Sequence, residues 1–280
     1  MFGQRRRQLL DENASLRSRV DELQQDNEQL RGQLDRATHE RDALRLAAHE
    51  PGPLREDLGF IFVVTYGRSG STLLMGLLNS IPGYCLRGEN AGVLYDLFQY
   101  QTKVTTSAAA NATPEPMAGT HPWFGIDEYP QDVALARMRQ LVIDSLLRPE
   151  PDTRVSGFKE IRWWMAQPVE YLDFIDQVFP GCRYILNTRN HEDVTQSSWY
   201  RKNPKAGEDL VKIEERLKDT VGRRGDRGYH VHYDDYVKDR SVVQGLFEWL
   251  GEPYDADRVE QVFGTRHSSS RHWKNESTKT

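Results

Sequence analysis

The chain has 280 residues, of which 38% are hydrophobic and 28% charged, and its formal net charge at pH 7 is −5. This length suits one large globular domain with an accessory element, and the acidic balance excludes the overall positive field of a nucleic-acid-binding protein. Because no apolar run approaches the roughly 18 residues of a membrane span, we expect no transmembrane segment.

Two cysteines, Cys85 and Cys182, are too few for a disulfide framework and are not spaced as a metal pair. We see no other metal-ligand spacing and expect no metal cofactor. The first residues, MFGQRRRQLLDEN, lack the apolar stretch of a secretory signal. Together these features predict a cytoplasmic protein.

Residues 9–46 carry a heptad pattern with charged flanks, which is typical of a coiled coil. The residues at position d are Leu9, Leu16, Leu23, Leu30, Ala37 and Leu44, and those at position a are Asn13, Val20, Asn27, Leu34 and Arg41. We therefore predict a coiled-coil helix over residues 1–50. The asparagines at position a favour a parallel, in-register homodimer. The alternative is a single solvated helix, because Ala37 and Arg41 weaken the seam.

Pro51-Gly52-Pro53 ends this helix, so residues 51–57 are a predicted linker and residues 58–280 the globular domain. Residues 60–65 are apolar and β-branched, which predicts a buried strand of a parallel sheet. A glycine-punctuated turn follows, and then leucines with the spacing of one helix face. In this layout, backbone N–H groups and a helix N-terminus bind an anion.

The turn therefore predicts a phosphate-like ligand, with two flexible glycines, three hydroxyl donors and one guanidinium. These candidate binding residues are Gly67, Arg68, Ser69, Gly70, Ser71 and Thr72. The turn lacks the G-x-x-x-x-G-K-[ST] motif of ordinary ATPases and GTPases. The alternative is a plain strand–helix connection.

Glu89 follows a short predicted strand, 84–86, and precedes a predicted helix, 93–100, with Asn90 as a candidate N-cap. The carboxyl ends of parallel strands face the ligand crevice in open α/β sheets. The residues alone also allow Glu89 to be a carboxylate favoured by the helix macrodipole. Residues 101–130 lack apolar periodicity and predict an irregular insert or lid. His121 within them is a second candidate base.

A helix is predicted over residues 132–147 and a strand over 153–158, and Lys159 directly follows this strand. Lys159 could belong to a surface ion-pair set, which would add little stability, or could point into the crevice. Residues 183–188 predict the next buried strand. Arg189 follows this strand, and Ser197 stands eight positions further on, in a predicted helix that Asn190 caps.

Further predicted elements are a helix over 168–179, a strand over 230–233 and a helix over 241–250. The strand–helix alternation indicates an α/β fold. The tail is basic and rich in hydroxyl groups, and it contains Arg271 just before Trp273-Lys274-Asn275. Taken alone, such a tail is typical of a disordered terminus.

Several of these segments together resemble sulfotransferases that use 3′-phosphoadenosine 5′-phosphosulfate (PAPS). TYGRSGST is similar to their 5′-phosphosulfate loop, and Arg189 with Ser197 is similar to their 3′-phosphate site. LRGEN and GFKE are similar to segments of some members that carry a glutamate base and a lysine. YDDY, followed by a helix and LGEPYD, is similar to a structural segment. The resemblance covers roughly residues 58–275, and it is weakest at Arg271 because the usual Arg-Lys-Gly run is missing.

The resemblance implies a three-layer α/β sandwich with a central parallel sheet, the P-loop nucleotide-hydrolase-like sulfotransferase fold, over residues 58–280. It implies sulfuryl transfer from PAPS to an acceptor hydroxyl, most simply on a carbohydrate or glycolipid. A tyrosyl-protein or small-metabolite acceptor is the alternative, and a nucleotide-dependent kinase or a non-catalytic coiled-coil scaffold belongs to another class. The implied catalytic residues are Glu89, Arg68 and Lys159. The implied PAPS-binding residues are Gly67, Arg68, Ser69, Gly70, Ser71, Thr72, Arg189, Ser197 and Arg271.

Overall fold

The computed structural model describes residues 16, 19–20, 23–34, 36–37, 55, 57–113, 117–163, 167–197, 200–201 and 203–265. The chain divides into two compact units, Met1–Pro53 and Leu54–Thr280. In the first unit, the described residues are helical, in agreement with the predicted helix. Their large apolar side chains are between 51% and 67% exposed, namely Leu16, Val20, Leu23, Leu30 and Leu34. The rest of the predicted coiled coil lies outside the described residues.

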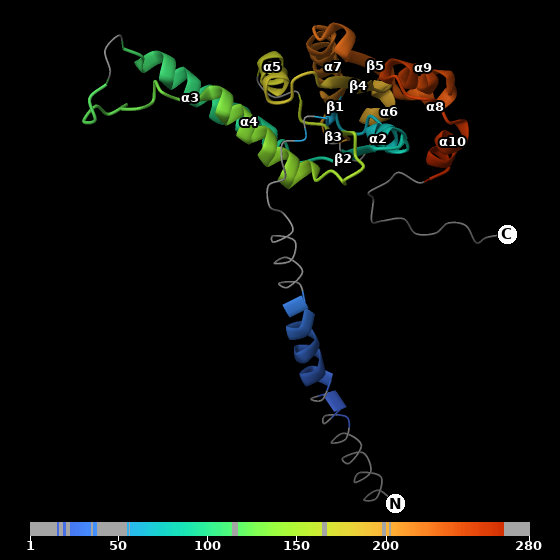
Figure 1. Ribbon diagram of the computed structural model, residues 1–280. Helices are drawn as coiled ribbons and strands as arrows, with labels where there is room; N and C mark the ends of the chain where they lie inside the picture. Colours follow the sequence, from blue (N-terminus) through green and yellow to red (C-terminus); the bar gives the residue numbers. More distant parts are fainter. Residues whose placement is uncertain are drawn as a thin grey trace, which may run out of the picture. The chain divides into compact units, whose positions relative to one another are not determined.

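The second unit is built on a sheet of five parallel strands in the order β2-β3-β1-β4-β5. Parallel neighbours need crossover connections, and helices supply them on both faces of the sheet (Figure 1). The strands are β1 (Gly59–Val64), β2 (Tyr84–Arg87), β3 (Val155–Glu160), β4 (Arg183–Thr188) and β5 (Gly228–His232).

Eleven helical segments follow the strands in the second unit's described residues. The α-helices are α2 (Ser71–Asn79), α3 (Val93–Asn111), α4 (Gln131–Val142), α5 (Pro168–Val178), α6 (His191–Thr195), α7 (Ala206–Gly222), α8 (Tyr233–Lys238), α9 (Ser241–Leu250) and α10 (Ala256–Gly264). A π-helix, η1 (Ile143–Leu147), continues α4, and a 3₁₀-helix, η2 (Gly225–Arg227), precedes β5. None of the helices in the described part of the chain has the length and apolar character needed to cross a membrane.

The central strand β1 shows why this sequence forms three layers. Alternate side chains of a strand point to opposite faces, and all of β1 beyond Gly59 is buried. Phe60, Phe62 and Val64 pack in the core that α3, α4, α5 and α7 cover. Ile61 and Val63 pack in the core that α2 and α9 cover. A strand buried on both faces needs a continuous apolar run, which is the pattern that predicted it.

The predicted elements agree in order and type with the structure except near residues 101–130 and at the end of α6, whereas α7, α8 and α10 were not predicted. The strand 183–188 and the helix 241–250 have the predicted bounds. Residues 101–111, however, are not irregular, because α3 continues to Asn111. That stretch contains no glycine or proline and ends in three alanines, so its backbone favours a helix although its apolar pattern is weak. The predicted helix over 132–147 is α4 followed by the π-helix η1.

Candidate active site

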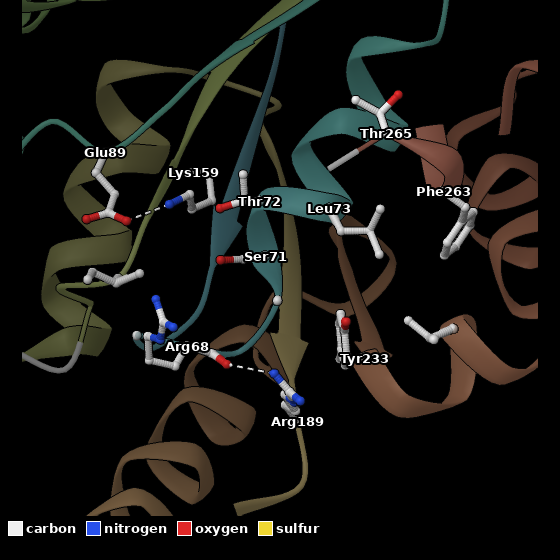
Figure 2. A pocket seen from close by; sticks show the side chains of 14 residues that line it. Arg68, Ser71, Thr72, Leu73, Glu89, Lys159, Arg189, Tyr233, Phe263 and Thr265 are labelled. Atoms are coloured by element: carbon white, nitrogen blue, oxygen red, sulfur yellow. Dashed lines mark hydrogen bonds and ion pairs between the residues drawn. The ribbon is translucent and has the colours of Figure 1, made fainter. Parts of the chain in front are cut away.

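A cavity of about 590 Å³ lies where β1, β3 and β4 end and where α2 begins (Figure 2). Ligands bind at this edge in open α/β sheets. Three of the charged side chains that line it are cations and one is an anion, so the cavity favours an anionic ligand. The lining residues are Gly67, Arg68, Gly70, Ser71, Thr72, Leu73, Glu89, Lys159, Ile161, Arg189, Tyr233, Val237, Phe263 and Thr265.

The glycine-punctuated loop brings the N-terminus of α2 to the cavity. Arg68 and Gly70 have φ of 68° and 79°, which is the left-handed region. Gly70 is the N-cap of α2 and offers no side-chain cap, and the first turn of α2 carries no acidic residue. The free N–H groups and positive end of the helix dipole are therefore open to an anion. This geometry agrees with the predicted anion-binding loop.

Tyr233 explains why position 70 must be glycine. A Cβ atom at Gly70 would lie 2.1 Å from the Tyr233 ring. The guanidinium carbon of Arg189 lies 4.5 Å from the centre of the same ring, a cation–π contact. Tyr233 therefore packs against both the anion-binding loop and Arg189.

Ser69 does not point into the cavity, although its hydroxyl was predicted to bind the anion. Its side chain is fully buried, and its hydroxyl lies 2.6 Å from that of Thr65. Its carbonyl accepts a hydrogen bond from the side-chain amide of Asn187. Ser69 therefore fastens the loop to β4 and does not line the cavity. The other predicted loop residues do line it.

Glu89 and Lys159 meet at the cavity wall as a close ion pair. Nζ of Lys159 donates to Oε1 of Glu89 at 2.6 Å. The Lys159 side chain is only 6% exposed, whereas that of Glu89 is 38% exposed. A buried ammonium needs such a partner. The exposed carboxylate edge of Glu89 can still face a substrate, so the structure brings the two predicted residues together.

Arg189 has only distant partners at another edge of the cavity. Its guanidinium nitrogens lie 3.6 Å from Asp193 and 4.0 Å from Asp234, and Nη1 donates to the Arg68 carbonyl at 3.4 Å. Its Nε is buried, as is Oγ of Ser197, and neither has a hydrogen-bond partner among the described residues. Buried polar atoms without partners are rare in folded proteins. Both atoms could donate to a phosphate group, although only Arg189 lines the cavity and Ser197 does not.

Ser197 lies just beyond α6, which ends at Thr195, and therefore not within the predicted helix. The N-cap prediction is confirmed, because the Asn190 side chain accepts from the N–H groups of Glu192 and Asp193. The N-cap of α3 is Gly92 rather than Asn90, and the side chain of Asn90 accepts the Gly92 N–H.

A buried hydroxyl joins the anion-binding loop to the backbone of Arg189. The Tyr66 hydroxyl accepts the Arg189 N–H at 2.9 Å and donates to Oε2 of Glu214 at 2.6 Å. Burial raises the pKa of the Glu214 carboxyl, but hydrogen bonds from Lys218, Tyr66 and His191 outweigh it and hold this pKa at about 2. Burial raises the pKa of Tyr66 far above its usual range. Glu214 is therefore an ionised anchor at neutral pH.

A second network supports the segment after β4. The Thr188 hydroxyl lies 2.8 Å from Nε2 of His230 and 2.8 Å from Nδ1 of His232. Nε2 of His232 lies 3.2 Å from Asp234, which accepts the Asn190 N–H. If both imidazole rings are neutral, one set of donors is consistent with these distances. Nε2–H of His230 donates to the Thr188 hydroxyl, that hydroxyl donates to Nδ1 of His232, and Nε2–H of His232 donates to Asp234. Burial, followed by the charge of Lys218, lowers the pKa of His230 and favours this neutral form.

Other predicted site residues lie elsewhere. His121 is exposed, and its Nδ1 accepts the Trp123 N–H. No described residue between 101 and 130 lines the cavity, and the loop that joins α3 to α4 lies at the end of these helices away from the sheet (Figure 1). Arg271 lies outside the described residues.

The sequence interpretation missed Tyr66, Tyr233 and Glu214 as parts of the site. Tyr233 was interpreted as structural support, although it lines the cavity. Its position directly after β5 was the available signal, because it repeats the strand-end placement of Arg189. Glu214 had no local signal, since it lies within α7 and 148 residues from Tyr66.

One comparison with known proteins identifies a family. The model of the sulfotransferase family matches residues 61–256. No curated protein sequence matches the chain at a significant level. The sulfotransferase domain from the Synechococcus PCC 7002 olefin synthase is 19% identical, with a TM-score of 0.47 over 77% of this chain and 81% of that one. The sulfotransferase domain from the curacin biosynthetic pathway is 16% identical, with a TM-score of 0.46 over 76% of this chain and 80% of that one. Mouse sulfotransferase SULT7A1 complexed with PAP is 14% identical, with a TM-score of 0.39 over 73% of this chain and 63% of that one.

Proposed function

The chain belongs to the sulfotransferase family, and from this premise we propose that it transfers the sulfuryl group of PAPS to a hydroxyl group of an acceptor. One observation carries the assignment of the donor. The anion-binding loop at the start of α2 and Arg189 line the same cavity, and Arg189 Nε and Ser197 Oγ are buried donors without a partner among the described residues. PAPS has two separate anionic groups, which these two sets of donors fit.

In this proposal, the N–H groups of residues 67–72 and the guanidinium of Arg68 hold the 5′-phosphosulfate, while Arg189 and Ser197 hold the 3′-phosphate. The Arg68 side chain is exposed at the cavity, and no hydrogen bond engages it within the described part of the chain. It is therefore free to bind an incoming anion as a charge-assisted donor.

Transfer requires one bond to form and one to break. The acceptor oxygen bonds to sulfur, the bond from sulfur to the bridging phosphate oxygen breaks, and 3′-phosphoadenosine 5′-phosphate (PAP) leaves. Glu89 takes the proton of the acceptor hydroxyl as general base. An ammonium has three N–H donors, so Lys159 can keep its bond to Glu89 and still neutralise charge on the leaving oxygen. Positioning and electrostatics supply the catalysis, as in phosphoryl transfer.

A carbohydrate or glycolipid is the acceptor class that we propose. The aromatic residues that line the cavity, Tyr233 and Phe263, lie on the opposite side from Glu89 and Lys159 in Figure 2. Among the described residues that line the cavity, none on the side of Glu89 and Lys159 is aromatic. Polar groups such as these two suit a hydroxyl-rich acceptor. Transfer of radiolabelled sulfate to sugars, tyrosine peptides and simple phenols tests this choice, and preference for a phenolic acceptor would contradict it.

Calorimetry with PAP, AMP and ATP tests the donor. We expect tight binding of PAP that is lost on removal of the 3′-phosphate. ATP binding as tight as that of PAP would contradict the proposal and favour a kinase. Tight PAP binding without turnover of PAPS on any of these acceptors would favour a non-catalytic scaffold.

We also propose that the N-terminal helix forms a parallel homodimer. The exposed apolar side chains at positions a and d support a partner helix. In this heptad register, the g–e′ pairs of a parallel dimer include Glu12–Arg17, Asp26–Arg31 and Glu40–Arg45, and no pair is repulsive. An antiparallel dimer would instead set the e-position arginines against each other.

The oligomeric state and orientation can be tested separately. Light scattering should give a dimer for the full chain and a monomer after deletion of residues 1–50, and an unchanged mass would contradict the proposal. A Val20→Cys variant should form an intermolecular disulfide only in the parallel dimer, because residue 20 then faces its copy. Both natural cysteines, Cys85 and Cys182, are free, so they should be replaced by serine in this experiment.

Free cysteines also support a cytoplasmic location, which cell fractionation tests.

A further inference from the structure

Glu160, the last residue of β3, is a buried carboxylate that the reaction scheme above does not use. Its side chain is 3% exposed. Oε2 accepts the N–H groups of Asn90 and Gly92, both at 3.0 Å. Oε1 accepts the N–H groups of Ile161 and Arg162, at 2.7 and 3.2 Å, and Nη1 of Arg162 at 3.2 Å. Both oxygens therefore accept hydrogen bonds only, which requires an ionised carboxylate.

The loop that carries Glu89 has a conformation that needs this support. Ala91 and Gly92 have φ of 62° and 79°, and the value at Ala91 is uncommon for a residue with a side chain. Gly92 begins α3 without a side-chain cap. The N–H groups at a helix start need acceptors, and a negative charge there is favourable. Glu160 supplies both from a neighbouring strand.

The contacts of Glu160 also set the register between two catalytic residues. The parallel pairing of β2 and β3 ends at Arg87 and Phe158. Beyond that point, side chains replace the backbone ladder. Lys159 bonds to Glu89, and the next residue, Glu160, bonds to the backbone of Asn90. Nη1 of Arg162 binds the Glu160 carboxylate and lies 4.0 Å from Oε2 of Glu89.

We propose that Glu160 is a positioning residue whose carboxylate holds loop 89–92 in the conformation that sets Glu89 against Lys159. The inference rests on the role proposed above for Glu89. Glu160 itself does not line the cavity, so it acts through its neighbours and not on the substrates.

A Glu160→Gln variant tests the proposal, because the amide keeps one acceptor oxygen but replaces the other with an NH₂ group, which cannot accept the N–H groups that converge there. We expect turnover to fall by about 10- to 100-fold, with PAP affinity within about twofold of the wild-type value. Amide hydrogen exchange at Asn90 and Gly92 should become faster, while exchange in β1 and β4 stays unchanged. Glu252→Gln is the matched control, because Glu252 also binds an arginine, Arg154, at 2.6 and 2.7 Å but lies outside the cavity. This control should leave turnover and the exchange of loop 89–92 unchanged.

The double variant Glu89→Gln/Glu160→Gln decides whether Glu160 acts through Glu89. If it does, adding Glu160→Gln to the Glu89→Gln variant lowers turnover no further. An equal fold-loss in both backgrounds would overturn the proposal, as would unchanged loop exchange in the single variant. If Glu89→Gln alone keeps full activity, the base assignment fails, whereas exchange at Asn90 and Gly92 still decides whether Glu160 holds the loop.

Discussion

At the side of the cavity that holds Glu89 and Lys159, opposite charges already meet at 2.6 Å, whereas at Arg189 the nearest carboxylate oxygens lie 3.6 and 4.0 Å away. Figure 2 shows these two regions on different sides of the anion-binding loop. Lys159 is almost fully buried, so it needs a close partner in the absence of substrate. Arg189 instead stacks on Tyr233 and keeps a buried Nε without a hydrogen bond.

In the function proposed above, the difference separates two tasks. The catalytic region, Glu89 with Lys159, satisfies its own charges and is therefore formed before substrate arrives. The nucleotide region, Arg189 with Ser197, keeps unpartnered buried donors, which a bound anion would satisfy. Changes in the first region should therefore alter turnover, and changes in the second should alter affinity.

The largest expected effect is at Glu89. Glu89→Gln keeps the size of the side chain but removes the base, so we expect turnover to fall by about 10²- to 10⁴-fold. PAP affinity should stay the same or rise slightly, because Lys159 loses its counter-charge. Steady-state kinetics and calorimetry measure the two quantities on one preparation. Full activity in this variant would move the base elsewhere, and a matching loss of PAP affinity would erase the distinction between the two regions.

Arg189→Ala should have the next largest effect, on affinity. Hydrogen bonds to charged groups contribute about 1.5–3 kcal/mol each, so losing the guanidinium should weaken PAP binding by about 100-fold. AMP, which lacks the 3′-phosphate, should bind almost as before. The matched control is Arg183→Ala at the opposite end of β4, where the guanidinium bonds to carbonyls of α9. This control should lower stability and leave the preference for PAP over AMP intact. An equal loss for PAP and AMP in Arg189→Ala would contradict the assignment.

The Tyr66–Glu214 contact joins the anion-binding loop to the backbone of Arg189, and it predicts a pH dependence of stability. The folded pKa of Glu214, about 2, lies below the ordinary value of 4.5. A lowered carboxyl pKa stabilises the folded state above about pH 4.5, and this contribution is lost as the pH falls toward 2. It amounts to about 2–3 kcal/mol at neutral pH.

Urea unfolding at several pH values measures this contribution. Glu214→Gln should be less stable than the wild type at pH 7, and the two should converge near pH 2–3. A constant difference across this range would show that the charge of Glu214 does not anchor Tyr66. The variant should also weaken PAP binding, because Tyr66 links the anion-binding loop to the backbone of Arg189.

Local patterns were enough to predict most of the side chains that line the cavity. Strand ends, glycines and helix starts stand within a few residues of each other in the sequence, so residues 67–72, Glu89, Lys159 and Arg189 could be found from their positions. Ser69 was assigned to the cavity because loop composition does not reveal which way one hydroxyl turns. Its bond to Thr65 depends on the backbone angles of the folded loop.

The supporting residues could not be predicted, because their partners are distant in the chain. Tyr66 and Glu214 are 148 residues apart, and Glu160 and Gly92 are 68 apart. A glutamate in an amphipathic helix is ordinarily solvated, and only the packing of α7 against β4 buries this one. The extension of α3 was missed for a different reason, since helix propensity without an apolar face leaves little periodic signal.

Ser197→Ala carries the smallest expected effect and tests the nucleotide region most finely. The low end of the range for a hydrogen bond to a charged group is about 1.5 kcal/mol, so PAP affinity should fall by about tenfold while AMP affinity and turnover at saturating PAPS stay unchanged. Thr195→Ala is the matched control, because its hydroxyl already donates to the Glu192 carbonyl at 2.9 Å. If the control weakens PAP binding as much as Ser197→Ala does, the loss comes from the end of α6. If Ser197→Ala instead raises stability without weakening PAP, the buried hydroxyl is a packing defect, and Arg189 holds the 3′-phosphate without it.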